Sequence, residues 1–129
     1  MAQLQVELVA ADRKVWSGPA SMVIAKTTEG DVGILPGHVP FLGVLVNGAV
    51  QVRRDGADPV VAAVHGGFLS LADDQVSILA EVAELASEID VERARSALAR
   101  IEAMPELDAE AKAAKERALA RIRAAGLAF

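Results

Sequence analysis

The sequence has no cysteine and no tyrosine, and its 129 residues include only one tryptophan and three phenylalanines. Without cysteine, the chain cannot form disulfide bonds, thiolate nucleophiles or cysteine-ligated zinc sites. With so few aromatic side chains, it is poorly equipped for base stacking or cation–π binding. The two histidines, His38 and His65, are too few for a metal site, so we predict no metal.

Positive charge is also scarce, because 13 basic residues face 18 acidic ones and the formal net charge is −5. Nucleic-acid binding depends on Lys and Arg that neutralise phosphates, so we expect no nucleic-acid partner. The N-terminal residues do not show a basic region followed by a long apolar one, so we expect no secretion signal. Residues 32–52 contain no Asp, Glu, Lys or Arg, but their two prolines and four glycines argue against a membrane-spanning helix. We therefore expect contact with a membrane only through partners.

The first part of the chain has the pattern of short strands. Leu4, Val6 and Leu8 alternate with their neighbours, which indicates a half-buried strand, and similar segments follow between turn residues. Asn47-Gly48 predicts a type I′ hairpin between two of these segments. Such regular spacing predicts a sandwich or a barrel. We expect strands near residues 4–9, 15–16, 21–27, 32–35, 41–46, 49–53, 60–64, 68–71 and 76–79.

The apolar period becomes helical near Ser87. Asp90 and Asp108 are placed to cap two helices; Met104-Pro105 ends the first and Gly126 the second. Two helices joined by so few residues form an antiparallel hairpin. The predicted fold is therefore mainly β plus α, with an N-terminal β-sandwich over residues 1–87 and a C-terminal two-helix hairpin over residues 88–129.

The apolar faces of the predicted hairpin are mostly alanine. Alanine favours helix, but burying its methyl group yields less transfer free energy than burying Leu or Phe, at about 25 cal/mol per Å². We therefore hypothesise that the hairpin is conditionally attached to the sandwich. Its second helix is also locally basic, which suits either the helix dipole or an acidic protein surface. These basic residues are Lys112, Lys115, Arg117, Arg121 and Arg123.

Residues 29–40 combine glycines, prolines and apolar residues around His38. Pro36 and Pro40 restrict the backbone on both sides of this histidine. The segment is therefore either an ordinary tight turn or a corner that presents His38 in one orientation to a partner or a substrate. His65 follows an apolar strand, and we interpret it as a hydrogen-bonded structural imidazole.

Enzymatic motifs are lacking, since the chain has neither a Gly-x-Ser-x-Gly elbow nor the Gly-Lys-Ser/Thr ending of a P-loop. We predict no catalytic residue. Asp90 and Arg93 lie on one helix face, where an acid and a guanidinium can hold a purine edge and a phosphate. The alternative interpretation of these two residues is a helix cap followed by a solvated arginine.

Four segments together carry a resemblance: residues 29–40, His65-Gly-Gly-Phe-Leu-Ser70, Val76-Ser-Ile-Leu-Ala80 and Ile89-Asp-x-x-Arg-Ala94. They occur in the order found in the ε subunit of the bacterial F-type ATP synthase, which the sequence therefore resembles. That family has an N-terminal β-sandwich and a C-terminal helix hairpin, as the residue patterns predict here. The resemblance implies a non-catalytic rotor subunit of the central stalk, peripheral on the cytoplasmic face of the cell membrane.

The resemblance also implies partners. The sandwich would sit against the γ subunit and the membrane c-ring, coupling proton-driven rotation to ATP synthesis. The hairpin would extend toward the α and β subunits of the catalytic head and oppose ATP hydrolysis, with the five basic residues of its second helix facing acidic partner surface. The residues implied in the coupling surface are Gly33, Ile34, Leu35, Pro36, Gly37, His38 and Pro40.

In some members of that family, the motif matched by Ile89, Asp90, Arg93 and Ala94 binds ATP and holds the hairpin folded down. The resemblance thus implies no required cofactor but ATP as a candidate regulatory ligand. Two other functions stay open on the residues alone. One is a stand-alone β-sandwich binding module whose helices form a structural cap, and the other is an enzyme that uses His38 as a general base.

Overall fold

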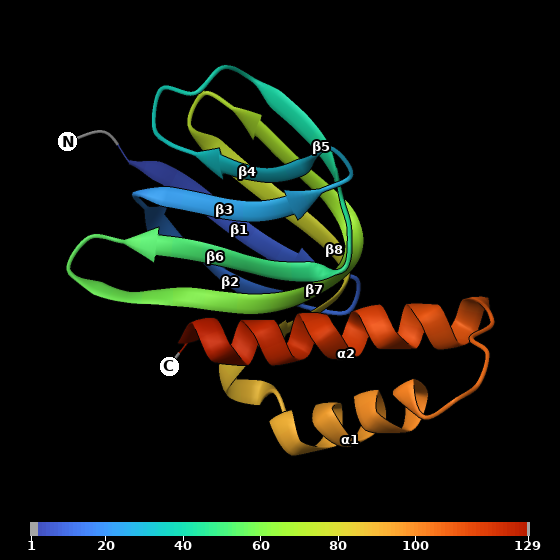
Figure 1. The fold of residues 1–129 in the computed structure, drawn as a ribbon. Coiled ribbons are helices and arrows are strands. Elements are labelled where there is room, and N and C mark those ends of the chain that lie inside the picture. The colour runs from blue at the N-terminus through green and yellow to red at the C-terminus, as the bar shows by residue number, and fades with distance from the viewer. Residues whose placement is uncertain (1–2, 129) are drawn as a thin grey trace.

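The computed structural model describes residues 3–128 and contains a β-sandwich followed by two packed helices (Figure 1). This arrangement confirms the predicted fold class. The N-terminal elements are β1 (Leu4–Ala10), β2 (Lys14–Ala20), β3 (Met22–Thr27), β4 (Gly30–Ile34), β5 (Phe41–Leu45) and β6 (Gly48–Arg54). The later elements are β7 (Ala57–Ala72), β8 (Gln75–Leu85), the 3-10 helix η1 (Ala86–Glu88), α1 (Val91–Glu102) and α2 (Ala109–Ala128).

The two layers of the sandwich are joined through the 16-residue strand β7. Its first half pairs with β6 and its second half pairs with β5, both antiparallel. Strand β8 pairs with β7 along most of its length and continues the sheet to β1, in parallel, and then to β2. Strand β3 closes the other side by pairing with β4, β5 and β6.

The sandwich core follows from the alternation of apolar residues along the strands. Leu4, Val6 and Leu8 of β1 are all buried, with Gln5 exposed and Glu7 half-buried between them. The same period makes β7 two-faced, because successive side chains point to opposite sides of a strand. Ala62 and Val64 lie in the sandwich core, whereas Val61 and Ala63 form a second cluster with Ala86 and Ala124 under α2.

The predicted hairpin at Asn47-Gly48 is wrong. Strand β5 pairs with β7 and β3, and β6 pairs with β3 and β7, so the two strands do not form a ladder with each other. A type I′ turn needs positive φ at both central residues, and neither Asn47 nor Gly48 is among the residues with positive φ. The segment instead carries the chain from one layer of the sandwich to the other (Figure 1).

Several predicted boundaries also differ. The segments expected at residues 60–64 and 68–71 are parts of one strand, which continues through the positive-φ pair Gly66 and Gly67. The helix starts are confirmed, because the Asp90 and Asp108 side chains accept hydrogen bonds from Arg93 N and Ala111 N. The expected end at Gly126 is wrong, since α2 continues to Ala128. Glycine is tolerated within a helix at a modest cost in stability.

Candidate functional site

The corner between β4 and β5 is held by specific hydrogen bonds. Gly37 N donates to Asp74 Oδ1 over 2.8 Å, which ties the corner to the β7–β8 turn, and His38 N donates to Leu35 O over 3.1 Å. Gly37 has a φ of 86°, which glycine adopts without the steric cost that a Cβ imposes. The His38 ring packs edge-on against Phe41, with 6.4 Å between centroids. The corner is therefore a built structure with one defined shape.

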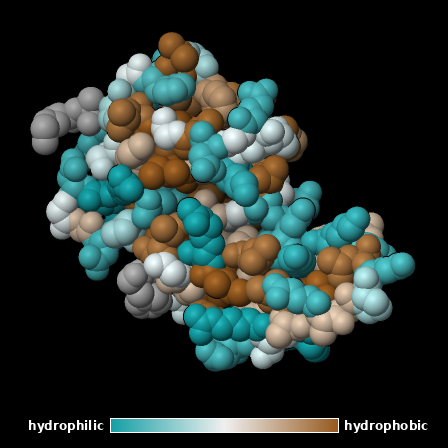
Figure 2. Space-filling model, in the orientation of Figure 1, coloured by the Kyte–Doolittle hydropathy of each residue, from teal (hydrophilic) through white to brown (hydrophobic). Residues whose placement is uncertain are grey.

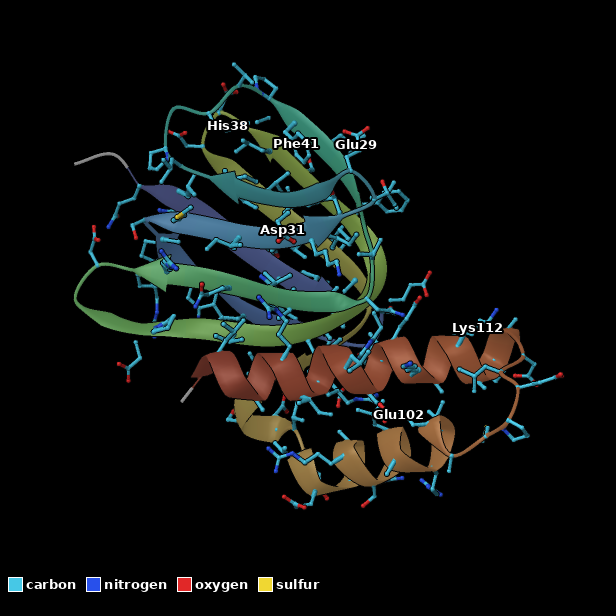
Figure 3. All side chains as sticks on the ribbon, viewed as in Figure 1. Glu29, Asp31, His38, Phe41, Glu102 and Lys112 are labelled. Atoms are coloured by element: carbon cyan, nitrogen blue, oxygen red, sulfur yellow. The ribbon has the colours of Figure 1, made fainter. Side chains whose placement is uncertain are left out.

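The side chains of this corner mostly face outward. Leu35 is 54% exposed and Val39 is 71% exposed, and His38 and Pro40 are also exposed. Figure 3 places His38 at the end of the sandwich farthest from the helices, and Figure 2 shows hydrophobic side chains at the same tip. Ile34 differs, because its side chain lies in the sandwich core. It anchors the corner from within.

A row of exposed apolar side chains crosses the outer face of the layer formed by β5, β7 and β8. Val44 pairs with Phe68, and Phe68 pairs with Leu79, so the three side chains are neighbours across the strands. Leu42, two residues before Val44 on the same strand face, is 73% exposed. We call Leu42, Val44, Phe68 and Leu79 the outer apolar row.

The motif at the start of α1 acts as a helix start in this structure. Asp90 Oδ1 accepts a 3.0 Å hydrogen bond from Arg93 N, while the Arg93 side chain is exposed. Ala94 is buried and Ile89 is partly buried against the second cluster. The structure therefore brings the four motif residues together at the base of the hairpin, with the side chain of Arg93 exposed.

The five basic residues of α2 have different environments. Arg117 pairs with Glu110 on the same helix at 3.0 Å, and Arg121 pairs with Glu84 of β8 at 2.6 Å. Lys112 and Arg123 are exposed, and Lys115 is half-buried. Figure 3 shows Lys112 near the start of α2, well away from the sandwich. Arg121 is the member of this set that forms an ion pair to the sandwich.

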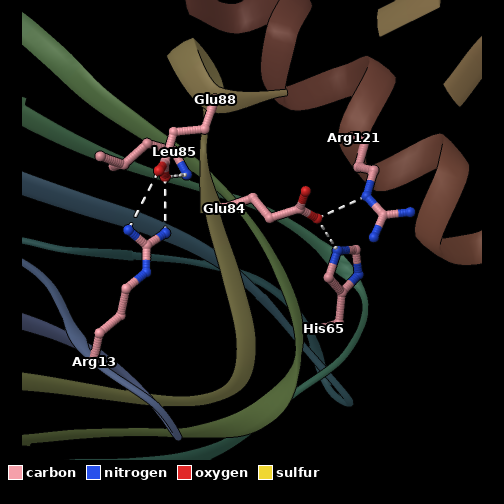
Figure 4. A network of polar contacts seen from close by, with 6 residues as sticks. All are labelled: Arg13, His65, Glu84, Leu85, Glu88 and Arg121. Carbon is pink, nitrogen blue, oxygen red and sulfur yellow. Dashed lines mark hydrogen bonds and ion pairs between the residues drawn. The ribbon is translucent and has the colours of Figure 1, made fainter. Parts of the chain in front are cut away.

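Glu84 joins the helix pair to the sandwich (Figure 4). Its Oε1 atom accepts from Arg121 Nε at 2.6 Å and lies 3.1 Å from His65 Nε2. Partial burial alone would raise the pKa of Glu84, but hydrogen bonds from Arg121 and His65 outweigh it and hold this pKa below its ordinary value. His65 is 5% exposed, and its burial lowers the pKa of the imidazole.

Glu84 and the outer apolar row were not predicted from the sequence. Glu84 lies 37 residues from Arg121, and only the three-dimensional fold brings them together. The row had a local signal, because Phe68 and Leu79 stand at polar-face positions of their strands, where an apolar residue is unexpected.

Within residues 3–128, no group of three or more His, Cys, Asp or Glu side chains is placed to hold a metal ion. No helix in this part of the chain is long and apolar enough to cross a membrane. His38 contacts Val39 O through Nδ1 and the edge of Phe41, and no described hydrogen bond joins it to a carboxylate.

The sandwich belongs to a known class of domain. Residues 3–86 match the model of the family described as ATP synthase, Delta/Epsilon chain, beta-sandwich domain. These residues include the corner and the whole outer apolar row. The match ends at η1, before the two helices begin.

Relatives that span the helices as well define the family further. The chain is 58% identical over 123 residues to an ATP synthase epsilon chain of Streptomyces griseus, covering 95% of each chain. It is 57% identical over 127 residues to an ATP synthase epsilon chain of Thermobifida fusca, covering 95% of this chain and 92% of that one. This chain therefore belongs to the family of ATP synthase epsilon chains.

Solved structures share the fold. A chain in the cryo-EM structure of the Euglena gracilis mitochondrial ATP synthase, OSCP/F1/c-ring, in rotational state 1, matches with a TM-score of 0.79 and 27% identity. The match covers 95% of this chain and 79% of that chain. A chain in the central stalk/c-ring structure of the Tetrahymena thermophila mitochondrial ATP synthase gives a TM-score of 0.59 at 19% identity, which is a likeness of fold alone.

Proposed function

We propose that this chain is a non-catalytic central-stalk subunit of a proton-translocating F-type ATP synthase. It is peripheral on the cytoplasmic face of the cell membrane, couples c-ring rotation to ATP synthesis and opposes ATP hydrolysis through its C-terminal helices. Membership of the epsilon-chain family supports this proposal, as does the likeness to a chain of a structure that contains F1 and a c-ring. The observation that carries it is the pair of exposed surfaces on the sandwich.

The outer apolar row suits the γ subunit. Its side chains are 46–73% exposed, and a contiguous apolar patch that spans three strands is typical of a protein interface. Phe68, at 54% exposure, can act as a central aromatic anchor of the kind that dominates binding free energy. We propose that γ covers this row in the assembled complex.

The corner suits the c-ring. It lies at the tip of the sandwich opposite the helices, and its backbone is fixed by Asp74 and by turn hydrogen bonds. A rigid contact transmits rotation directly, whereas a mobile loop would first deform. We propose that His38, Leu35 and Val39 contact the polar loops of the c-ring, with Gly33, Pro36, Gly37 and Pro40 setting the backbone shape.

The hairpin supplies the regulatory part of the proposal. Its contact with the sandwich is made largely by alanine methyl groups, with Ala124 completely buried. The Glu84–Arg121 pair adds a polar link that would have to break on release. Release would break the ion pair of Arg121. The basic residues of α2 could then face acidic surfaces of the α and β subunits together: Lys112, Lys115, Arg117, Arg121 and Arg123.

We also propose that ATP is a regulatory ligand at Ile89, Asp90, Arg93 and Ala94. The exposed side chain of Arg93, whose backbone N–H donates to the Asp90 carboxylate, supports the proposal, because Arg binds phosphate oxygens in a bidentate manner. Isothermal titration of ATP into the full chain tests it. We expect saturable binding that Arg93→Ala weakens, whereas Arg100→Ala, at another exposed position of α1, leaves it unchanged. An Arg93→Ala variant that binds ATP as tightly as the unmodified chain would contradict this site.

Co-purification tests the main function. An affinity-tagged chain expressed in its own cells should bring down γ and the c-ring from detergent-solubilised membranes. Recovery of the chain alone would instead favour a stand-alone binding module.

A groove of about 740 Å³ between α2 and the strands β3 and β6 supports the stand-alone binding module as a second candidate function, since the volume of the groove is suitable for a small ligand.

A further inference from the structure

His65 lies at the contact between the sandwich and the hairpin. Because side chains alternate along a strand, His65 shares the face of β7 that carries Val61 and Ala63, which is the face covered by α2. The side chain is 5% exposed, and its Nε2 atom lies 3.1 Å from Glu84 Oε1. The imidazole is thus buried under the helix that the proposed function requires to move.

The hydrogen bonds of His65 suit the neutral imidazole. With the proton on Nε2, the ring donates to the Glu84 carboxylate. Its Nδ1 atom is buried and has no hydrogen-bond partner among the described residues. A second proton would occupy Nδ1, where it would be a buried donor without an acceptor, which costs free energy.

The charged groups around His65 act in opposite directions, and the arginines act in the same direction as burial. The groups that face it are Glu84 on β8 and the guanidinium groups of Arg121 and Arg117 on α2. Glu84 favours a charged imidazole, but its Oε1 atom already accepts the 2.6 Å hydrogen bond from Arg121. Burial lowers the pKa of His65, and the two arginines lower it further despite Glu84.

We propose that His65 is a proton-binding switch of the hairpin: its protonation below neutral pH releases α2 from the sandwich. This inference rests on the proposed function for its biological meaning, because it assigns a trigger to the proposed movement of the hairpin. Release of α2 uncovers His65 and withdraws Arg121 and Arg117, while Glu84 stays next to it on β8. The released form therefore holds the second proton more readily than the docked form.

The sign of the pH dependence follows from linkage. The pKa of His65 is lowered in the docked form, so docking is strongest above the ordinary value of 6.5 and weakens as the pH falls through it. Each pKa unit between the two forms changes the docking equilibrium about tenfold once the pH is below both values. Glu84, whose ordinary value is 4.5, adds its own loss of docking only in a more acidic range.

Hydrogen exchange of the full chain tests the proposal. Protection of α2 amides is measured between pH 8 and pH 5.5, relative to amides of β1 and β8, which correct for the intrinsic pH dependence of exchange. We expect the relative protection of α2 to fall severalfold across this range, and by no more than about tenfold, because pH 5.5 lies one unit below the ordinary value of 6.5. Nuclear magnetic resonance titration of the His65 ring should give a pKa below 6.5 at the same time.

Two variants make the test specific. His65→Gln keeps an N–H donor near the Nε2 position without a titrating group, so α2 should stay protected at pH 5.5. His38→Gln removes the other histidine, which is exposed and far from α2, so the pH response should persist. An unchanged pH response in His65→Gln, or constant α2 protection in the unmodified chain, would overturn the proposal. Neither result affects co-purification with γ and the c-ring, so a failure here is distinct from a failure of the proposed function.

Discussion

At the scale of single residues, Gly67 has the strictest requirement in the chain. Its φ is +125°, and a Cβ built on it would lie 2.0 Å from the carbonyl oxygen of Leu79. That oxygen belongs to the backbone of β8, so it cannot turn aside as a side chain does. At this point of β7, only glycine tolerates both the positive φ and the close approach of the Leu79 carbonyl oxygen.

We predict that Gly67→Ala lowers the free energy of unfolding by roughly 2–5 kcal/mol, combining backbone strain and overpacking. Urea unfolding followed by circular dichroism measures the change. Gly56→Ala is the matched control, since Gly56 has a φ of +72° but open space around its Cβ position. The Gly56→Ala variant should lose only about 1 kcal/mol of unfolding free energy, which is the cost of a non-glycine residue in the left-handed region. Equal losses in the two variants would contradict the close-approach argument.

Residue types alone predicted some of these roles and not others. The caps Asp90 and Asp108 were predictable because a cap bonds to a residue three positions away, within one turn. The break expected between the strands near residues 60–64 and 68–71 was wrong, because β7 continues through Gly66 and Gly67. The Glu84–Arg121 contact was not predictable, because a pair separated by 37 residues leaves no periodic pattern. His65 was expected to be a hydrogen-bonded structural imidazole, and the hydrogen bond to Glu84 confirms the first part of that expectation.

At the scale of elements, too, features set by neighbouring residues were predictable from the sequence, whereas contacts between distant segments were not. The alternation in β1 and the helical period of α1 were read correctly, because each is set within a few residues. The pairing of β5 with β6 was predicted wrongly, since both strands pair instead with β3 and β7, which compete for the same edges. A turn dipeptide does not encode that competition.

The docking of α2 depends on small side chains at close range. Ala124 is 0% exposed and belongs to the second cluster with Val61, Ala63 and Ala86, which is separate from the sandwich core. A longer polar side chain at this position would have to enter the cluster or displace the helix. The sandwich core has no contribution from Ala124 and should remain intact.

We predict that Ala124→Glu releases α2 without unfolding the sandwich, because burying an unpaired carboxylate costs at least about 2 kcal/mol. At neutral pH, hydrogen exchange should show α2 protection falling by roughly 30-fold or more, with the strands unchanged. Ala99→Glu places the same side chain at an exposed alanine of α1 and should have no such effect. Loss of protection in the strands as well would show that hairpin and sandwich unfold as one unit.

At the scale of the whole molecule, the two proposed docking surfaces and the hairpin occupy different parts of the sandwich. The corner lies at the tip far from the helices, and the outer apolar row crosses β5, β7 and β8. The hairpin packs on β6 and the first half of β7. The hairpin can therefore leave its position while the row and the corner stay covered by their proposed partners.

The outer apolar row should matter more for partner binding than for folding. Phe68 is 54% exposed, so Phe68→Ser should lower the free energy of unfolding by only about 1 kcal/mol. If γ covers the row, the same substitution removes an aromatic anchor and should weaken binding to purified γ by roughly tenfold or more. Met104→Ser is the control, because Met104 is 46% exposed between the two helices, away from the row. Binding by titration calorimetry, with urea unfolding of each variant, separates the two effects. Unchanged γ affinity in Phe68→Ser would exclude the row as the γ contact, whereas a large loss of stability would show that Phe68 supports the fold.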